Sequence, residues 1–511
     1  MLTQVLLLAS AAVRAEAEPT SELILVQSLT RHGNRAPNPT ITTSCPKLYP
    51  TRADIVRTFG AEPAGLTNMG MNQMRNVGSL LRRRYIDGGF APAAYNPHQK
   101  AYYFQARGQP RHQQSCAAMG QGLFPIGTGP VTYPDRLQPI AISSWDTGTD
   151  FTLFPPTAPC AAVMGAENAA WAASTGAALV ADNLDIVRAL ERTCGSSIER
   201  AADPAATTKD IVDAVLFLQD EYLPPPPGLP AAMARRAVFL AQAMLTSKLF
   251  GAPDRQTMWL ADFPAALLER MDCALRPGAA GVCPLRYGGY VSSRELLFVL
   301  GQTLGLAFDV PGLPPTALPP ASTLTFELRQ RGGGGAAAPE PFVACRLTVP
   351  PRRQADVNVT HSRALPLGAC AGKLECPLSQ FRAIFAALNA STGPWRSICR
   401  VRAVGADGVS AAVVTGGEGG GGAPGSSTGS AAPGASSGVS PAVVSALVCG
   451  VLGLVAGAGL GSRAAQRRGA ATPASANAQD SPPLLTPAEA GRSSPADAGA
   501  LQSYGSIHST V

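Results

Sequence analysis

The chain has 511 residues and a formal net charge of +7, so it exceeds one typical domain in length. It contains no dense Lys/Arg run with interleaved aromatic residues, which argues against nucleic acid as a partner. The last hundred or so residues become low-complexity sequence, so the folded part is expected to end near residue 405.

Residues 1–17 have the pattern of a secretory signal peptide. Leu2 to Val13 is apolar, and Ala15-Glu16-Ala17 offers small residues around a cleavage site. A buried first helix is the alternative, but the cysteine content described below favours secretion. We therefore expect a folded region over residues 18–405 that enters an oxidising compartment.

The apolar run Leu23–Val26 predicts a buried strand, and the segment Thr30–Pro37 follows it. The glycine and proline of this segment end regular structure, so basic side chains gather where a strand gives way to a loop. Ligands of open α/β sheets bind at the carboxyl ends of strands. Arg31 and Arg35 beside His32 therefore indicate capture of a phosphate next to a nucleophilic imidazole, with a basic surface turn as the alternative.

Further along, apolar spacings of three and four predict a helix over Leu66–Tyr85 with Thr67 as its N-cap. Residues 101–104 predict a second strand, and the loop that follows contains arginines and opens a helix. A helix N-terminus beside an arginine favours a bound anion.

Residues 125–285 read as a mostly helical insertion, with helices at 210–222 and 231–250 between proline-rich loops. A strand end is predicted at 290–293, followed by a helix over 294–306. Residues 324–328 and 341–349 alternate like the two strands of a hairpin. Asn358 and Asn389 begin N-glycosylation sequons, as expected on a secreted face.

Residues 406–440 form a Gly/Ser/Pro-rich stretch that cannot bury a core and predicts a flexible stalk. Residues 441–462 carry no charge, and about 20 apolar residues suffice to cross ~30 Å of hydrocarbon. Three arginines follow within the next few residues, which predicts a single type I transmembrane helix. The long polar tail argues against a lipid-anchor signal, and the stalk argues against a buried core helix.

The cytoplasmic tail, residues 463–511, contains two short apolar groups. Leu484 and Leu485 follow an acidic residue as in a dileucine sorting signal, and Tyr504 with Ile507 resembles a tyrosine-based signal. Each motif also occurs by chance. Together they predict recognition by adaptor proteins and location in the endosomal or lysosomal membrane, with the cell surface as the alternative.

The eleven cysteines are scattered and form no paired Cys-x-x-Cys sets, so no zinc site is expected. Cys449 lies in the apolar segment near the C-terminus, which leaves ten in the main body. An even number is typical of disulfide-bonded proteins of oxidising compartments. Cys370 and Cys376 are near enough in sequence for a local bridge, and the other pairings stay open.

The pattern Arg31-His32-Gly33-x-Arg35-x-Pro37 resembles the signature of the histidine acid phosphatases. Leu66-Thr67-x-x-Gly70-x-x-Gln73 resembles the next characteristic helix of that family, and Cys370 with Cys376 resembles its C-terminal cysteine pair. The resemblance covers about residues 22–400. With the stalk, span and tail, the layout is similar to that of the membrane-bound acid phosphatases of kinetoplastid protozoa.

The resemblance implies an α/β fold, with a mixed sheet flanked by helices on both faces and a smaller, mostly helical cap. It also implies a phosphomonoester substrate, a phosphohistidine on His32, and Arg31 and Arg35 on the equatorial oxygens. A covalent intermediate divides one difficult displacement into two easier ones, and preplaced cations stabilise the developing charge. No metal or other cofactor is then required. The other histidines are expected to be surface or structural residues: His98, His112, His361 and His508.

Two elements of the family pattern are altered. Gln105 falls where a third phosphate-binding arginine is expected, and Arg107 takes that role if the loop is shorter. The His-Asp pair that contacts phosphate and supplies the leaving-group proton aligns with Ser293 and Arg294, so the pair is absent. A general acid typically contributes on the order of 10²–10⁴ in rate.

Three interpretations of this loss stay open. Glu295 supplies the proton, or turnover is confined to good leaving groups, or the protein binds phosphorylated ligands without efficient turnover. Arg294 is a candidate replacement phosphate clamp. The sequence thus predicts a membrane-anchored acid phosphatase, with a catalytically weak phosphate-binding membrane glycoprotein of endosomal trafficking as the alternative. It leaves open the natural substrate and whether the chain forms a homodimer.

Overall fold

The computed structural model describes residues 21–154, 160–251, 253–276, 283–309, 317–331, 340–350 and 361–400. All of them lie in one compact unit, Met1–Gly416. The predicted signal, stalk, membrane span and tail fall outside the described residues. None of the described helices is both long enough and apolar enough to span a bilayer.

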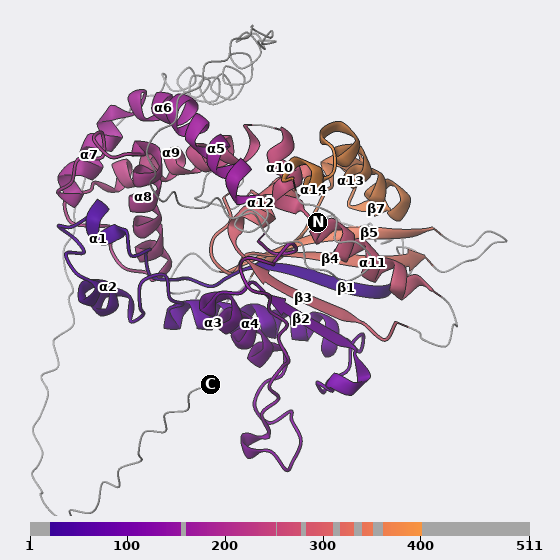
Figure 1. The fold of residues 1–511 in the computed structure, drawn as a ribbon. Coiled ribbons are helices and arrows are strands. Elements are labelled where there is room, and N and C mark those ends of the chain that lie inside the picture. Colours follow the sequence, from indigo (N-terminus) through magenta and orange to yellow (C-terminus); the bar gives the residue numbers. More distant parts are fainter. Residues whose placement is uncertain are drawn as a thin grey trace, which may run out of the picture. The chain divides into compact units, whose positions relative to one another are not determined.

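A seven-stranded mixed sheet forms the centre of the fold (Figure 1). Its strands are β1 (Ser21–Arg31), β2 (Tyr102–Ala106), β3 (Tyr287–Ser292), β4 (Thr323–Arg331), β5 (Pro341–Val349), β6 (His361–Leu365) and β7 (Glu375–Pro377). Their order is β2-β3-β1-β4-β5-β6, and β7 pairs with β5. β2, β3 and β1 run parallel, whereas β4 pairs antiparallel with β1. The carboxyl ends of the three parallel strands therefore meet at one edge of the sheet.

Helices account for most of the remaining described residues. They are α1 (Ile41–Ser44), α2 (Arg52–Phe59), α3 (Asn68–Leu81), α4 (Pro110–Leu123), α5 (Ala161–Trp171), α6 (Ala177–Ala181), α7 (Leu184–Cys194), α8 (Pro204–Asp220), α9 (Ala231–Phe250), α10 (Pro253–Leu260), α11 (Phe263–Leu275), α12 (Arg294–Leu304), α13 (Leu378–Thr392) and α14 (Trp395–Ile398). The helices expected at 66–85, 210–222, 231–250 and 294–306 correspond to α3, α8, α9 and α12. The expected hairpin is the antiparallel pair β4 and β5.

The two faces of the sheet bury different cores, because successive side chains of a strand point to opposite faces. Leu25 and Leu29 of β1 belong to a core that also contains residues of α11, α12 and α13. Val26, between them, belongs to a second core with residues of α3 and α4. Figure 1 shows α3 and α4 on one side of the sheet and α13 on the other. The sheet is therefore flanked by helices on both faces, as predicted.

A third core joins the cap helices α6 to α9, and it draws in α1 and α2, which precede the insertion predicted at 125–285. The disulfide Cys45–Cys194 ties the end of α1 to the end of α7. Within the predicted range, α10 and α11 contribute their buried residues to the core that contains Leu25 and Leu29 of β1. The apolar faces of these helices thus divide the insertion between two cores.

Four disulfide bonds occur among the described residues: Cys45–Cys194, Cys160–Cys399, Cys273–Cys283 and Cys370–Cys376. The last is the local bridge that the sequence suggests. Cys116 and Cys345 are buried with free thiols. The even number of main-body cysteines thus predicted more disulfide bonds than these residues form. Cys116 and Cys345 instead pack as apolar side chains in the hydrophobic cores.

Candidate functional site

The backbone of His32 is held from both sides where β1 ends. Its N–H donates to the carbonyl of Ser292 in β3 at 2.9 Å, and its own carbonyl accepts from Ala321, just before β4, at 3.0 Å. A Cβ atom on Gly33 would lie 2.2 Å from the carbonyl oxygen of Gly70, so only glycine allows this loop to lie against α3. The loop is therefore fixed by neighbouring backbone on three sides.

The imidazole of His32 has a defined tautomer. Its Nδ1 lies 2.8 Å from the carbonyl oxygen of Gly33, and because a carbonyl only accepts, Nδ1 carries the proton. Burial, together with the neighbouring His112 and Arg111, holds the pKa of His32 well below its ordinary value. The ring is therefore neutral, with the lone pair on Nε2, which is the form that can attack an electrophile.

Both predicted phosphate-binding arginines of the loop are buried. Arg31 donates to the carbonyl of Leu318, and burial lowers its pKa to about 9. Arg35 donates to Oδ1 of Asn38 at 3.0 Å and stacks over the Phe217 ring at 4.6 Å, and burial lowers its pKa to about 10. Buried cations whose charged form is disfavoured in this way are suited to an anionic ligand.

The structure places Arg107, rather than Gln105, beside the end of β3. Arg107 follows β2 and donates to Oγ of Ser293 at 2.9 Å, and its guanidinium lies 3.0 Å from the centroid of the Phe154 ring. Burial lowers its pKa to about 10. Gln105 lies within β2, where its side chain accepts from the hydroxyl of Tyr103 at 2.9 Å.

A second histidine lies in the site. His112, in the first turn of α4, is fully buried, and its ring centroid is 4.9 Å from that of His32. Its Nε2 lies 3.1 Å from Oγ of Ser293. His112 is therefore one of the buried histidines, and α4 directs its side chain at the nucleophile.

A signal for His112 was present in the sequence. Residues three apart share one face of a helix, so His112 and Ser115 point to the same side of α4. The hydroxyl of Ser115 accepts from the backbone N–H of Gly33 at 3.1 Å. Ser115 therefore marks the helix face that meets the nucleophile loop.

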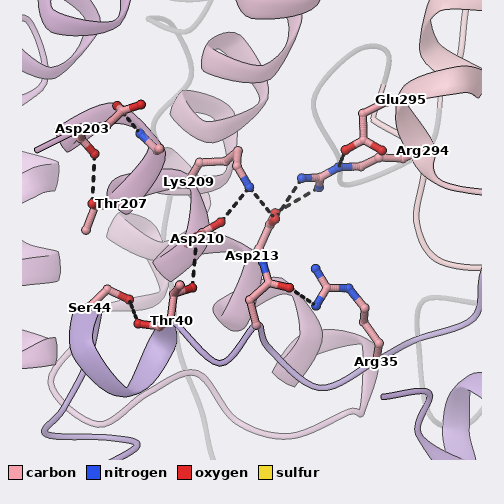
Figure 2. A network of polar contacts seen from close by, with 12 residues as sticks. Arg35, Thr40, Ser44, Asp203, Thr207, Lys209, Asp210, Asp213, Arg294 and Glu295 are labelled. Atoms are coloured by element: carbon pink, nitrogen blue, oxygen red, sulfur yellow. Dashed lines mark hydrogen bonds and ion pairs between the residues drawn. The ribbon is translucent and has the colours of Figure 1, made fainter. Parts of the chain in front are cut away.

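Arg294 has a carboxylate partner within the protein. It forms two parallel hydrogen bonds with Asp213 of α8, at 3.0 and 2.9 Å, and Lys209 lies 3.1 Å from the same carboxylate (Figure 2). Burial opposes the charge of Asp213, but Arg294 and Lys209 outweigh it and hold the pKa of Asp213 far below its ordinary value. Arg294 thus ties α12 to the cap, and the role of a free phosphate clamp is not available to it in this arrangement.

Glu295 lies next to Arg294, with 3.5 Å between its Oε1 and the Nε of the arginine. Burial opposes ionisation of this carboxyl, but the charges of Arg294, Lys209 and Arg31 outweigh it and hold its pKa below the ordinary range. The carboxylate is therefore ionised when the site holds no ligand.

Several buried nitrogen atoms around His32 lack a partner among the described residues. They are Nε of Arg31, Nε of Arg107, Nε of Arg111 and Nδ1 of His112. A buried polar group without a partner costs about 1–3 kcal/mol. An anion with several oxygen atoms would supply the acceptors. No cluster of three or more metal-ligating side chains is found in the part of the chain that the structure describes.

Of the other predicted site residues, the structure describes the glycosylation residue Asn389 and the disulfide pair Cys370–Cys376. Asn389 is exposed on α13. Asn358 of the other sequon lies outside the described residues, and so do the predicted sorting residues Leu484, Leu485, Tyr504 and Ile507.

Residues 22–147 match the model of the histidine phosphatase superfamily (branch 2). A Caenorhabditis elegans protein named as a candidate acid phosphatase is 32% identical over 139 residues, which span 26% of this chain and 28% of that protein. The match thus covers little more than a quarter of the relative.

Solved structures share the fold over most of the described residues. A Klebsiella phytase matches with a TM-score of 0.54 and 17% identity, over 76% of this chain and 98% of the phytase. A Hafnia alvei phytase in complex with tartrate matches with a TM-score of 0.53 and 15% identity, over 74% of this chain and 98% of that one. At such identities the likeness concerns the fold.

Proposed function

We propose that this chain is an acid phosphatase of the histidine phosphatase superfamily, whose model matches residues 22–147, and that it works through a phosphohistidine on His32. The observation that carries the proposal is the hydrogen bond from Nδ1 of His32 to the carbonyl of Gly33. It leaves Nε2 unprotonated and available as a nucleophile. Arg31, Arg35 and Arg107 are the cations that would hold the phosphate.

The reaction would proceed in two displacements. Nε2 of His32 attacks phosphorus, the ester P–O bond breaks, and the alcohol leaves with a proton. Water then attacks the phosphohistidine, the P–N bond breaks, and inorganic phosphate is released. Preplaced guanidinium groups stabilise the charge on the equatorial oxygens in both steps, which is the main requirement of phosphoryl transfer.

Hydrolysis of p-nitrophenyl phosphate at acid pH by the full-length chain tests this proposal. We expect His32→Ala to abolish turnover and His98→Ala, a change at an exposed histidine, to leave it unchanged. A phosphoenzyme trapped on His32 would support the mechanism. Equal rates for wild type and His32→Ala would refute it.

Glu295 is the proposed proton donor. Its pKa is low in the empty site because of Arg294, and a bound phosphate dianion would raise it. We expect Glu295→Gln to slow alkyl phosphates, which need a proton on the leaving group, more than p-nitrophenyl phosphate. A uniform decrease across leaving groups would remove Glu295 from this role.

A specific observation favours the second candidate, a phosphate-binding membrane glycoprotein with weak turnover. Ser293 and Arg294 stand where the family has its His-Asp pair, and the guanidinium of Arg294 is held by Asp213. The site therefore keeps its anion-binding groups but lacks the usual acid. Binding of inorganic phosphate without turnover of either class of ester would select this function.

We also propose that the chain is a single-pass type I membrane protein of the endosomal–lysosomal system, with the phosphatase region lumenal. The uncharged stretch 441–462, the arginines after it and the two sequons support this. Adaptor proteins would bind the tail through Leu484, Leu485, Tyr504 and Ile507. Changing Leu484, Leu485 and Tyr504 to alanine should shift the protein to the cell surface, and an unchanged distribution would refute the sorting role.

A further inference from the structure

His112 is buried with one of its two ring nitrogens unpaired among the described residues. It lies in the first turn of α4, it is fully buried, and its ring is nearly perpendicular to that of His32 at a centroid distance of 4.9 Å. Buried polar groups are almost always hydrogen-bonded. Only one of its two ring nitrogens, Nε2, has a partner among the residues that the structure describes.

Ser293 is turned toward this imidazole rather than toward its own helix. It stands at the N-cap of α12, where a serine hydroxyl usually accepts from the helix backbone, yet it makes no such capping bond. Its Oγ instead lies 2.9 Å from the guanidinium of Arg107 and 3.1 Å from Nε2 of His112. The serine thus gives up its capping role and connects the arginine with the histidine.

This connection favours a proton on Nδ1 of His112. The guanidinium of Arg107 can only donate, so Oγ of Ser293 accepts from it. The hydroxyl proton of Ser293 then has Nε2 of His112 as its acceptor within the described part of the chain. A neutral ring that accepts at Nε2 carries its proton at Nδ1.

The Nδ1 atom of His112 is buried and has no partner in the described structure. The ring is neutral, because burial and the charges of Arg111, Arg107 and Arg35 hold its pKa well below the ordinary value. Unpaired Nε atoms of Arg107 and Arg111 occur in the same region. Buried hydrogen-bond donors without acceptors, gathered beside a nucleophile, indicate a site for an anionic ligand. Nδ1 of His112 is one of these donors, so this histidine would contact the ligand too.

We propose that His112 is a phosphate-binding residue of this site and that its Nδ1–H donates to an oxygen of the phosphoryl group transferred to His32. The inference rests on the phosphatase function proposed above and assigns a role to a residue outside the signature. The imidazole of His112 is carried by α4. The residue after β3, Ser293, orients this ring through the contact with its Nε2. His112 acts on the phosphoryl oxygen and keeps its proton, so it is distinct from the leaving-group acid.

Substitution of His112 in the full-length chain tests the proposal. Loss of one donor from such a site costs roughly 10²–10³-fold in kcat. We expect His112→Ala to lower kcat/KM for p-nitrophenyl phosphate by about 10²-fold and to weaken inhibition by inorganic phosphate. His112→Asn, whose amide still donates, should recover part of both. Aryl and alkyl phosphates should lose the same factor, unlike the pattern expected for Glu295→Gln.

Two further variants separate phosphate binding from a structural role. His98→Ala is the matched control at an exposed histidine and should behave as wild type. In a His112→Ala chain, Ser293→His places an imidazole into the volume that the lost ring filled, and such exchanges of volume are tolerated in cores. Recovery of inhibition by inorganic phosphate in this double variant would support the proposal.

Unchanged kcat/KM and unchanged phosphate inhibition in a folded His112→Ala chain would overturn the proposal, while loss of turnover in His32→Ala would leave the phosphatase function standing. If the alanine variant does not fold, His112→Asn and Ser293→Ala decide, and wild-type values in both would overturn it. A wild-type chain that neither turns over phosphate esters nor binds inorganic phosphate would refute both proposals.

Discussion

At the scale of single residues, positive charge accumulates around His32 with few carboxylates to balance it. Burial lowers the pKa of Arg107 and that of Arg111 to about 10, and the two histidines stay neutral beside them. Asp213 is the counter-ion of Arg294, so its charge is already used. The cationic groups nearest the nucleophile would therefore be stabilised by a bound anion, which is the property expected of a phosphate site.

The neutral histidines make the empty site sensitive to acid. The unfolded chain protonates His32 and His112 around their ordinary pKa of 6.5, whereas the folded chain does so only at lower pH. The unfolded state then binds more protons, so their contribution to stability is complete above pH 6.5 and is lost progressively below it. We expect the melting temperature in phosphate-free buffer to fall from about pH 7 to 5, and to fall less in His112→Gln. The same pH dependence in both proteins would contradict this.

The Arg294–Asp213 ion pair is a second residue-scale target. Asp213→Ala removes the two hydrogen bonds that hold the buried guanidinium of Arg294 and leaves it only the more distant Glu295, and breaking a buried pair costs about 3–5 kcal/mol in the free energy of unfolding. Because the pKa of Asp213 is held far below 3.8, its contribution persists in mildly acid solution and is lost only as the pH falls below about that value. Urea unfolding at neutral pH measures the cost.

An exposed pair supplies the control for this prediction. Asp185 and Arg236 also form an ion pair, but their side chains are 55% and 54% exposed. Exposed pairs contribute about 0–1 kcal/mol, so Asp185→Ala should change the free energy of unfolding little. Equal effects of Asp185→Ala and Asp213→Ala would contradict the assignment of a buried tether.

At the scale of elements, two glycines set the approach of α3 and α4. A Cβ atom on Gly78 of α3 would lie 2.1 Å from the carbonyl oxygen of Met119, and one on Gly122 of α4 would lie 2.1 Å from that of Arg75. The two helices are therefore in backbone contact where they cross. This contact determines where the first turn of α4 places His112.

Gly78→Ala tests the crossing. The added methyl group cannot be accommodated without moving α4, and overpacking of this kind costs about 1–3 kcal/mol. We expect a lower melting temperature and reduced turnover of p-nitrophenyl phosphate. Gly165→Ala in α5 is the control, because its Cβ would meet no atom within 4 Å, and it should stabilise by about 0.4–1 kcal/mol. A drop in stability for the control as large as that for Gly78→Ala would refute the steric argument.

Elements with strong periodicity were predictable from the sequence, and contacts between distant elements were not. α9 has the bounds that its apolar spacing predicts, and β4 pairs with β5 as their alternation suggests. The position of His112 beside His32 and Ser293 was not predictable, because these partners lie far away in sequence and meet it only through the order of β2, β3 and β1. The partner of Cys160 is likewise 239 residues away.

At the scale of the whole molecule, disulfide bonds join parts of the chain that the sheet does not connect. Cys160–Cys399 closes 239 residues and links the start of α5 to the segment after α14. Cys273–Cys283 closes only 10 residues and begins in the last turn of α11. Closing a long loop removes more conformational freedom from the unfolded chain than closing a short one.

Removal of these bonds should therefore have unequal effects. We expect the double change Cys160→Ala and Cys399→Ala to cost about 2–5 kcal/mol in the free energy of unfolding, and removal of Cys273–Cys283 to cost less. Chemical unfolding of the two variants beside wild type measures the difference. A larger loss from the short loop would contradict the expected order.

The strand order also has a consequence for biosynthesis. β1, which leads to His32, has β3 and β4 as its sheet neighbours, and both are made long after it. At about 5–20 residues per second, β1 waits on the order of tens of seconds for them during translation. The nucleophile loop is thus among the first segments synthesised and among the last to be assembled. A chain truncated before β3 would carry the signature without an organised site.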